Sequence, residues 1–459
     1  MEIKDVEERH EELFELLENR RIKELQQILE GMNEFDIAAF LSELKPQQMA
    51  MVFRMLSKEK GAEVFANLEV EEQELIINSI TDTELASIIE ELYLDDAVDM
   101  MEELPANVVK RVMRIATSET RNLINQFLRY PEDSVGSIMT AEYVDLKKYM
   151  NVRESIARIR RIGKDSETIY TCYVTSADRR LEGVVTLREL LLSNDDEIIE
   201  NIMDTNVIFA TTTDDKERVV NLFSDYDLLA VPVVDKEGRL VGIVTVDDVI
   251  DVMHQEATED IEKMAAITPS DRPYMRLGTL ELWRNRIPWL MLLMIGATFT
   301  GLIISSFEDA LAAQAALTAF IPMLMGTGGN SGSQSSVTIV RGLSLGEIRF
   351  SDMGKILWKE LRVGLLCGIS LAAVNFIKIL LVDHTLLGNS EITIMIAAVV
   401  CITLVGTVVV AKLVGCILPL LVEKIGLDPA VMASPLLSTI VDALTLCVYF
   451  SVARGLLKL

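Results

Sequence analysis

Three hydrophobic patterns succeed one another along the chain. In the first part, apolar positions recur at the spacing of amphipathic helices, most clearly in 12–18 and 37–44, and prolines follow several predicted helices. Between 136 and 252, short apolar runs separated by turns indicate strands. Later apolar stretches reach about 20 residues, enough to cross a bilayer. We therefore predict a multidomain protein with an all-α superhelical N-domain at 1–132, an α/β region, and an α-helical membrane domain at 286–459.

The α/β region contains an internal duplication. Each copy has two predicted strands followed by a helix, the strands being 171–175 and 181–186 in the first copy and 229–235 and 240–246 in the second. The last strand of each copy leads into a similar helix start, Gly-Val-Val-Thr-x-x-Glu189 and Gly-Ile-Val-Thr-x-x-Asp248. These units resemble a tandem pair of CBS domains, which we place at 136–200 and 201–252.

The CBS resemblance implies a nucleotide site. Such pairs commonly bind adenine nucleotides, and the acid at the helix start often holds the ribose. Asp248 and Arg188 are accordingly the candidate contacts for ATP. In the first copy the position that matches Asp248 holds Glu189, which departs from the family pattern. Many CBS pairs have a purely structural role, which is the alternative interpretation.

Acidic residues are concentrated in the helical stretch that leads from the second CBS copy towards the membrane. Residues 247–263 hold seven carboxylates and one lysine. Close carboxylates repel one another unless cations screen them. We therefore interpret 253–285 as an acidic connecting helix with an interface segment, and we favour a divalent-cation sensor over a simple charged linker. In the N-domain, Asp95 and Asp99 share a helix face, so either a solvated face or a bridging cation is expected there.

Five membrane spans are predicted in the C-terminal part of the chain. Their approximate bounds are 287–307, 312–341, 358–382, 392–421 and 431–454. Lys and Arg cluster before the first span and in the loop after the second, which places the N-terminal domains and that loop in the cytosol.

Two features inside this membrane part indicate chemistry. Residues 322–334 interleave four glycines with hydroxyl and amide side chains, which is compatible with a bilayer only against other helices or a watery path. Asp442 is the only acid within the last apolar run, and an ionisable residue at membrane depth marks a substrate path by default. The alternatives are tight helix packing by the glycines, and for Asp442 a position at a helix end or an ion pair with Lys412. Together the two features suggest a cation path.

The charge balance supports a cationic partner. The net charge is −27, but residues 286–459 have 10 acidic and 11 basic residues, so the excess lies in 1–285. Such an acidic surface argues against nucleic acid as a partner, because binding a polyanion needs basic patches.

With these features together, the chain resembles the MgtE family of magnesium channels over nearly its whole length. The residues that show this best are Gly-Thr-Gly-Gly-Asn-Ser-Gly-Ser-Gln at 326–334, Asp-Pro-Ala at 428–430, and Asp442. The resemblance implies a homodimer in the lipid bilayer with a pore lined by the second and fifth spans. It further implies that Asp442 contacts a hydrated Mg²⁺, as expected for an ion that dehydrates reluctantly. The implied pore-lining positions beside it are Gly326, Gly329, Asn330 and Ser434, of which Ser434 departs from the asparagine or glycine expected.

The resemblance also implies regulatory Mg²⁺ sites between the N-domain, the CBS pair and the connecting helix. The matching positions are Asp95, Asp99, Asp215, Glu217, Asp227, Asp248, Asp251, Glu256, Glu259 and Asp260. We expect a Mg²⁺-selective channel in the cell membrane, multi-pass with cytosolic N-terminal domains, that closes when cytosolic Mg²⁺ bridges these surfaces. The alternatives are a Mg²⁺ or Co²⁺ carrier coupled to Na⁺ or H⁺, and a membrane-bound nucleotide sensor without transport. An enzyme is not expected, because no histidine lies in a nucleophile motif.

Overall fold

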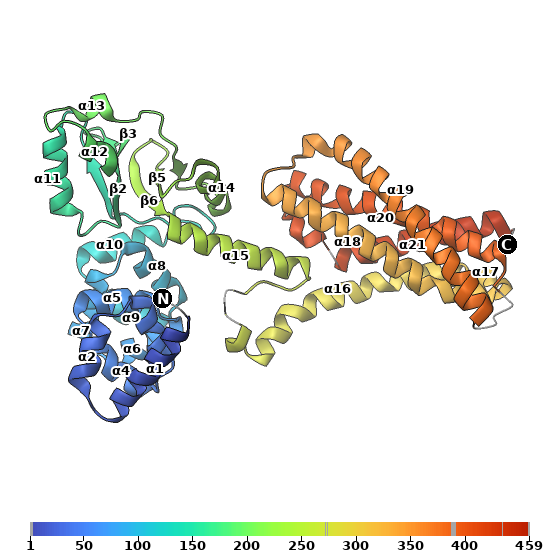
Figure 1. Cartoon of the computed structure of the whole chain (residues 1–459), viewed down its shortest axis with the longest axis horizontal. Coiled ribbons are helices and arrows are strands. Elements are labelled where there is room, and N and C mark those ends of the chain that lie inside the picture. The colour runs from blue at the N-terminus through green and yellow to red at the C-terminus, as the bar shows by residue number, and fades with distance from the viewer. Residues whose placement is uncertain (1–2, 271, 273, 387–391, 434, 458–459) are drawn as a thin grey trace. The chain divides into compact units, whose positions relative to one another are not determined.

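The computed structural model describes residues 3–457 apart from 271, 273, 387–391 and 434. The chain divides into two compact units, Met1–Met253 and His254–Leu459, which are described separately (Figure 1). The first unit contains helices and two small sheets, and the second is helical in the part that the structure describes. The predicted fold class is thus confirmed for the helical N-domain, the CBS-like α/β pair and the helical C-terminal region.

Ten short helices form the N-domain. Their bounds are α1 (Ile3–Glu18), α2 (Ile22–Glu30), α3 (Glu34–Ser42), α4 (Pro46–Phe53), α5 (Lys58–Ala66), α6 (Val70–Ser79), α7 (Asp82–Glu91), α8 (Leu94–Glu103), α9 (Ala106–Ile115) and α10 (Ser118–Phe127). Local caps define several of the starts. Ser57 accepts a hydrogen bond from the Lys60 amide, and Thr81 forms a reciprocal capping box with Glu84. The buried faces pack into one continuous apolar core with helix α14 (Lys216–Tyr226) and strands of the second CBS copy.

Each CBS copy is a three-stranded sheet with helices against it. In the first, β1 (Tyr143–Leu146) is parallel to β2 (Thr168–Thr175), and β2 is antiparallel to β3 (Leu181–Thr186). The second repeats this order with β4 (Ala210–Thr211), β5 (Ala230–Val234) and β6 (Leu240–Thr245). The accompanying helices are α11 (Val152–Ile162), α12 (Leu187–Leu192), α13 (Ile199–Ile202) and α14 (Lys216–Tyr226). The predicted strands are present, and the short first strands β1 and β4 were not predicted.

A single helix, α15 (Val246–Met264), leaves the second CBS copy and includes the boundary between the two units. It ends at Met264. A short 3-10 helix, η1 (Tyr274–Arg276), follows before the first long apolar helix.

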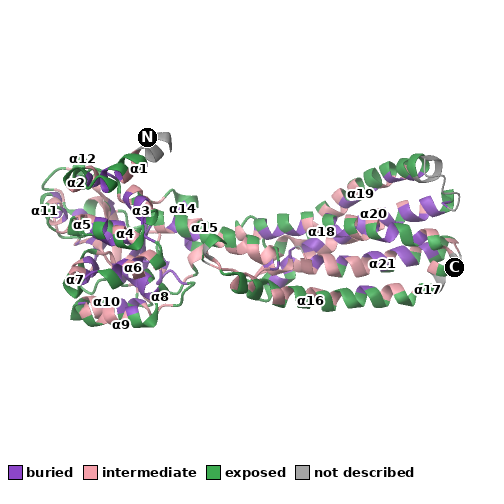
Figure 2. Cartoon of the chain, turned by 90° about the horizontal axis from the view of Figure 1, so that it is seen from below, coloured by how far each residue is buried: buried purple, intermediate pink, exposed green. Residues whose placement is uncertain are grey.

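The second unit is built from long helices. They are α16 (Thr279–Ser306), α17 (Glu308–Ala313), η2 (Ala315–Phe320), α18 (Ile321–Ser344), η3 (Phe350–Asp352), α19 (Met353–Lys378), η4 (Ile379–Leu386), α20 (Ile394–Lys424), η5 (Pro429–Met432) and α21 (Pro435–Leu457). Half of the apolar window of α20 is buried, and α18, α19 and α21 pack around it. Helix α16 has one buried residue, Thr300, and its other residues are exposed or half-buried (Figure 2).

Within the described residues, four stretches are long and apolar enough to cross a membrane: Thr279–Ser306, Phe350–Val382, Ile394–Lys424 and Pro429–Leu457. Helix α18, in the predicted second span, is not among them, because glycine, serine and amide residues lower its hydropathy. The span count of five therefore stays a prediction. The long helix begins at Ile321, whereas the predicted span began at 312, because α17 and η2 precede it.

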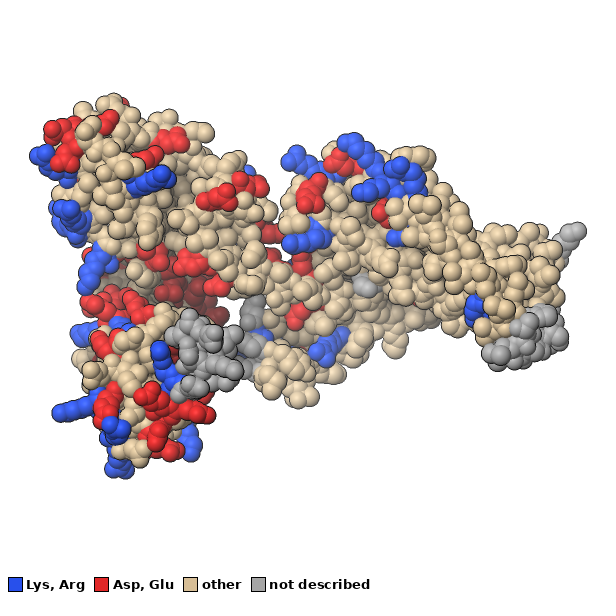
Figure 3. All heavy atoms as spheres, in the orientation of Figure 1, with Lys and Arg blue, Asp and Glu red and all other residues tan. Residues whose placement is uncertain are grey.

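Charge separates the two units as expected. Figure 3 shows Asp and Glu gathered on the visible face of the first unit, while most of the second unit's visible surface carries neither sign. A largely uncharged helical surface suits a lipid environment.

Candidate functional site: an ion path and its acidic regulatory surfaces

Helix α18 presents two different faces. Gly328 and Gly332 are buried in helix contacts, and a Cβ on Gly328 would lie 2.8 Å from both Thr407 Cγ2 and Thr445 Oγ1. Gly326 and Asn330, four residues apart, are exposed in the single chain, and nothing lies within 4 Å of a Cβ added to Gly326. The tight-packing interpretation is therefore correct for one face, and the other is an open polar stripe.

Asp442 lies on α21 where that helix meets α18. It is half-buried and follows Ser438 by four residues, so the two side chains share a helix face. Ser438 Oγ is 3.3 Å from the position of a Cβ on Gly329. The structure thus brings Gly329 and the Asp442 face of α21 together. The predicted site residue Ser434 lies outside the described residues.

Lys412, the proposed alternative partner of Asp442, is engaged elsewhere. Its ammonium nitrogen is 3.8 Å from Glu360 Oε2 and 3.2 Å from Ser335 Oγ. Among the described residues, no lysine or arginine forms an ion pair with Asp442. The partners of Lys412 in this structure are therefore Glu360 and Ser335, not Asp442.

In the first unit, carboxylates from three parts of the chain form an acidic cluster, which we define as Asp95, Asp96, Glu167 and Asp248. Asp95 and Asp96 lie on α8, Glu167 precedes β2, and Asp248 lies at the start of α15. Burial, together with the neighbouring negative charges, raises the pKa of Asp96 and Asp248 to about 6 and that of Glu167 to about 7. Burial also raises the pKa of Asp95, whose Oδ1 has no hydrogen-bond partner.

A cavity of about 310 Å³ adjoins this cluster at Asp96. The carboxylates that line it are Glu59, Glu63, Glu90, Glu91, Asp96, Glu142 and Asp165. Lys164, which also lines it, forms an ion pair with Glu59 at 2.9 Å. The surface between the N-domain and the first CBS copy therefore carries an excess of negative charge in a confined space, which favours cations.

The other predicted metal ligands are distributed over several elements of both units. Asp99 follows Asp95 on α8, Asp215 caps α14 by accepting from the Glu217 amide, and Asp251 is exposed on α15. Glu256, Glu259 and Asp260 belong to the second unit. In the described part of the chain, no three acidic, histidine or cysteine side chains converge as a metal site.

Sequence reasoning missed a basic contact at the end of α15. The ammonium group of Lys263 lies 2.6 Å from Asp428 Oδ2 and also pairs with Glu259. Burial opposes the charge, but these two carboxylates outweigh it and raise the pKa of Lys263. Met264, the next residue, packs against Ala430 and Ala433 beside η5. The connecting helix thereby contacts the turn that precedes α21.

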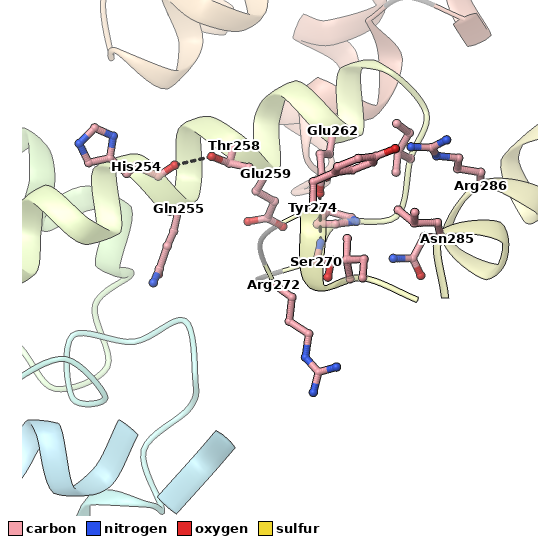
Figure 4. A pocket seen from close by; sticks show the side chains of 14 residues that line it. His254, Gln255, Thr258, Glu259, Glu262, Ser270, Arg272, Tyr274, Asn285 and Arg286 are labelled. Atoms are coloured by element: carbon pink, nitrogen blue, oxygen red, sulfur yellow. Dashed lines mark hydrogen bonds between the residues drawn. The ribbon is translucent and has the colours of Figure 1, made fainter. Parts of the chain in front are cut away.

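A pocket of about 420 Å³ lies beside this contact (Figure 4). The backbone folds back along α15 there, because the Ser270 amide donates to Glu262 Oε2 at 3.1 Å and the Thr268 amide donates to the Asn285 carbonyl at 3.0 Å. Arg272 and Arg286 are drawn at its rim in Figure 4. These bonds tie the end of the connecting helix to the start of α16.

A larger cavity of about 930 Å³ lies between the two CBS copies. Arg188, Asp204 and Asp227 line it together with aromatic and aliphatic side chains, which is typical of ligand pockets. Arg188, predicted as a nucleotide contact, is in its wall, as is Asp227, predicted as a metal ligand. Asp248 is not among its lining residues; it accepts a hydrogen bond from the Thr245 hydroxyl at 2.6 Å and belongs to the acidic cluster.

Comparison with known proteins agrees with this arrangement. Family models match residues 32–133 (MgtE intracellular N domain), 199–255 (CBS domain) and 321–452 (MgtE, divalent cation transporter). The magnesium transporter MgtE of Thermus thermophilus is 40% identical over 369 residues, which cover 80% of each chain. That of Bacillus subtilis is 31% identical over 440 residues, 96% of this chain and 95% of its own.

Among solved structures, the cytosolic domain of the Mg²⁺ channel MgtE in complex with ATP is 39% identical, with a TM-score of 0.50 over 52% of this chain and 98% of its own. The soluble part of a magnesium transporter is 31% identical, with a TM-score of 0.53 over 55% of this chain and 99% of its own. Fold and site together define a multi-pass membrane transporter of divalent cations whose soluble part carries a CBS pair. The chain belongs to the MgtE family of magnesium transporters.

Proposed function

We propose that this chain is a Mg²⁺-selective channel whose path runs between two copies of the chain, lined by α18 and α21. The observation that carries this proposal is the exposed stripe of Gly326 and Asn330 on a helix of the membrane domain. An amide in hydrocarbon needs polar partners, and a second protomer together with a file of water molecules supplies them.

Asp442 provides the one charged ligand of this path. Mg²⁺ usually keeps several waters and binds through one or two carboxylates, so one Asp442 from each protomer suits a hydrated ion. The neutral oxygens of Asn330 and Ser438 suit hydrogen bonding to its water shell. Influx needs no ATP, because a divalent cation gains about 4.6 kcal/mol per 100 mV of membrane potential.

Closure by cytosolic Mg²⁺ is the second part of the proposal. The acidic cluster and the cavity at Asp96 hold carboxylates whose mutual repulsion a bound cation relieves. Mg²⁺ shifts the equilibrium between the open and the closed channel towards the closed state. It does so because it binds more tightly when these acidic surfaces lie together, as in the closed state, than when they are separated. Lys263 and Met264 contact Asp428 and η5, so that a movement of the end of α15 is transmitted to the turn before α21.

The third part concerns the cavity between the CBS copies. The cytosolic domain of a related Mg²⁺ channel forms a complex with ATP. We propose that an adenine nucleotide binds in the 930 Å³ cavity here, with Arg188 facing its phosphates. Asp248 is assigned to cation binding instead.

Current recordings from purified protein in planar bilayers test the channel assignment. A channel gives unitary currents that reverse at the Mg²⁺ equilibrium potential and stop when Mg²⁺ is raised on the side of the soluble domains. A carrier coupled to Na⁺ or H⁺ gives a reversal potential that follows the coupled ion, with no resolvable unitary steps. Limited proteolysis across a Mg²⁺ titration tests closure: cleavage within 247–270 should fall at millimolar Mg²⁺, and unchanged cleavage contradicts the sensor.

A further inference from the structure

Besides Asp442, the membrane helices contain an ion pair between a buried lysine on α20 and a half-buried glutamate on α19, bridged by a serine on α18. Lys412 on α20 is only 5% exposed, and its Nζ lies 3.8 Å from Glu360 Oε2 on α19. Ser335 on α18, 3% exposed, completes the group. Its hydroxyl accepts from Lys412 at 3.2 Å and donates to Glu360 at 2.8 Å. The charges cancel, and the hydroxyl connects them.

The surrounding helices are shaped to admit this group. Gly364 lies one turn beyond Glu360 on α19, and a Cβ there would be 3.2 Å from Val409 Cα and 3.6 Å from Lys412 Cδ. The glycine therefore lets α20 approach and leaves room for the lysine stem. A buried ion pair contributes little net stability compared with apolar side chains, so its effect lies in fixing position.

The group acts on the helix that carries the polar stripe. Ser335 and Asn330 are five residues apart, or about 140° around the helix axis at roughly 100° per residue. Ser335 is buried against α19 and α20, whereas Asn330 is exposed. Ser336, which follows Ser335, donates to the Met432 carbonyl of η5 at 3.4 Å. Adjacent residues of α18 are thus bonded to different elements, which opposes rotation of the helix.

We propose that Lys412, Glu360 and Ser335 form a charge-neutral positioning site that sets the rotation of α18, so that Gly326 and Asn330 face the ion path. This inference rests on the proposed function, in which α18 lines that path. It assigns to Lys412 a role in ion selectivity without contact with the ion.

The test compares Lys412→Met, Lys412→Arg, Ser335→Ala and the double variant Lys412→Met with Glu360→Gln in proteoliposomes. Thermal stability, Mg²⁺ uptake and the ratio of Mg²⁺ to Co²⁺ uptake are measured for each. Lys412→Met alone leaves Glu360 unpaired and should lower the Tm by roughly 5 to 10 °C. The double variant should regain most of that stability but keep an uptake ratio changed by about tenfold, since small displacements of positioned groups have effects of this order.

Lys412→Arg should retain the wild-type ratio, and Ser335→Ala should change it in the same direction as the double variant with little loss of stability. Ser451→Ala is the matched control, because Ser451 is exposed and its hydroxyl donates to the Cys447 carbonyl of the same helix. A double variant and a Ser335→Ala variant with wild-type stability, uptake and ratio overturn the proposal. Asp442→Asn is measured in parallel: loss of uptake there, with unchanged ratios in the Lys412 and Ser335 variants, refutes the positioning site alone. Undiminished uptake by Asp442→Asn refutes the proposed path, and the positioning site falls with it.

Discussion

The repulsion within the acidic cluster predicts how removal of the Asp96 charge changes the packing of α8 against the start of α15. Replacing it by asparagine keeps the shape of the side chain and removes one negative charge beside Asp95 and Asp248. We expect Asp96→Asn to hold α8 more firmly against the start of α15 in the absence of Mg²⁺. The same substitution should reduce the further gain in protection that millimolar Mg²⁺ gives the wild type, because less repulsion remains for the cation to relieve.

The magnitude follows from the pKa. A rise from 3.8 to about 6 corresponds to roughly 3 kcal/mol of destabilisation when the carboxylate is ionised. Because the folded-state pKa lies above the unfolded value, this penalty is complete above about pH 7 and disappears as the pH falls towards 4. Asp248 carries a similar penalty and is coupled to Asp96, so the two do not add. We expect a gain of roughly 1.5 to 3 kcal/mol, or about ten- to a hundredfold in protection.

Hydrogen–deuterium exchange of the purified full chain measures this effect. Protection factors for α8 and for the start of α15 are compared at about pH 8 and about pH 5, with and without Mg²⁺. Wild-type protection should rise on acidification, and Asp96→Asn should flatten that dependence. Asp178→Asn, in an exposed turn, is the matched control. Identical protection in wild type and Asp96→Asn under all these conditions would refute the reasoning.

Three further substitutions have defined outcomes. Lys263→Met removes the ammonium group that pairs with Glu259 and Asp428, so Mg²⁺ uptake at low internal Mg²⁺ should rise about fivefold, as loss of about 1 kcal/mol implies. Closure at high Mg²⁺ should persist, and unchanged uptake at low Mg²⁺ contradicts this role of Lys263. Gly328→Ala introduces a methyl group into van der Waals overlap with α20 and α21 and should cost roughly 1 to 3 kcal/mol in thermal unfolding, whereas Gly301→Ala, in open space on α16, should not. Arg188→Ala should weaken ATP binding about tenfold by calorimetry, since a charged hydrogen bond is lost, and equal affinity would exclude the cavity as the nucleotide site.

Much of the fold could be predicted because its signals are local. The duplicated strands and their Thr-x-x-acid helix starts follow from alternation and capping, and in both copies the two predicted strands pair with each other. The start of α18 could not be placed, since a glycine- and amide-rich helix has no hydropathy edge and two short helices precede it.

The candidate site residues also fall into those that the sequence predicts and those that only the tertiary fold brings together. Asp442 and the glycine–amide stretch could be found because a lone acid and polar residues contrast with an apolar background. Glu167 gave no such signal, because only the tertiary fold brings it to Asp96 and Asp248. The choice of partner for Lys412 also depended on packing: Glu360 on the neighbouring helix is its partner, and no sequence spacing distinguishes it from Asp442.

Mg²⁺ uptake by Asp442→Asn in proteoliposomes under an imposed membrane potential tests the central claim most directly. The purified variant is compared with wild type and with Glu423→Gln, an exposed carboxylate at the end of α20. The ion-path account predicts that Asp442→Asn falls to the background of protein-free vesicles while Glu423→Gln matches the wild type. Wild-type uptake by Asp442→Asn, with the variant folded and inserted, would contradict it.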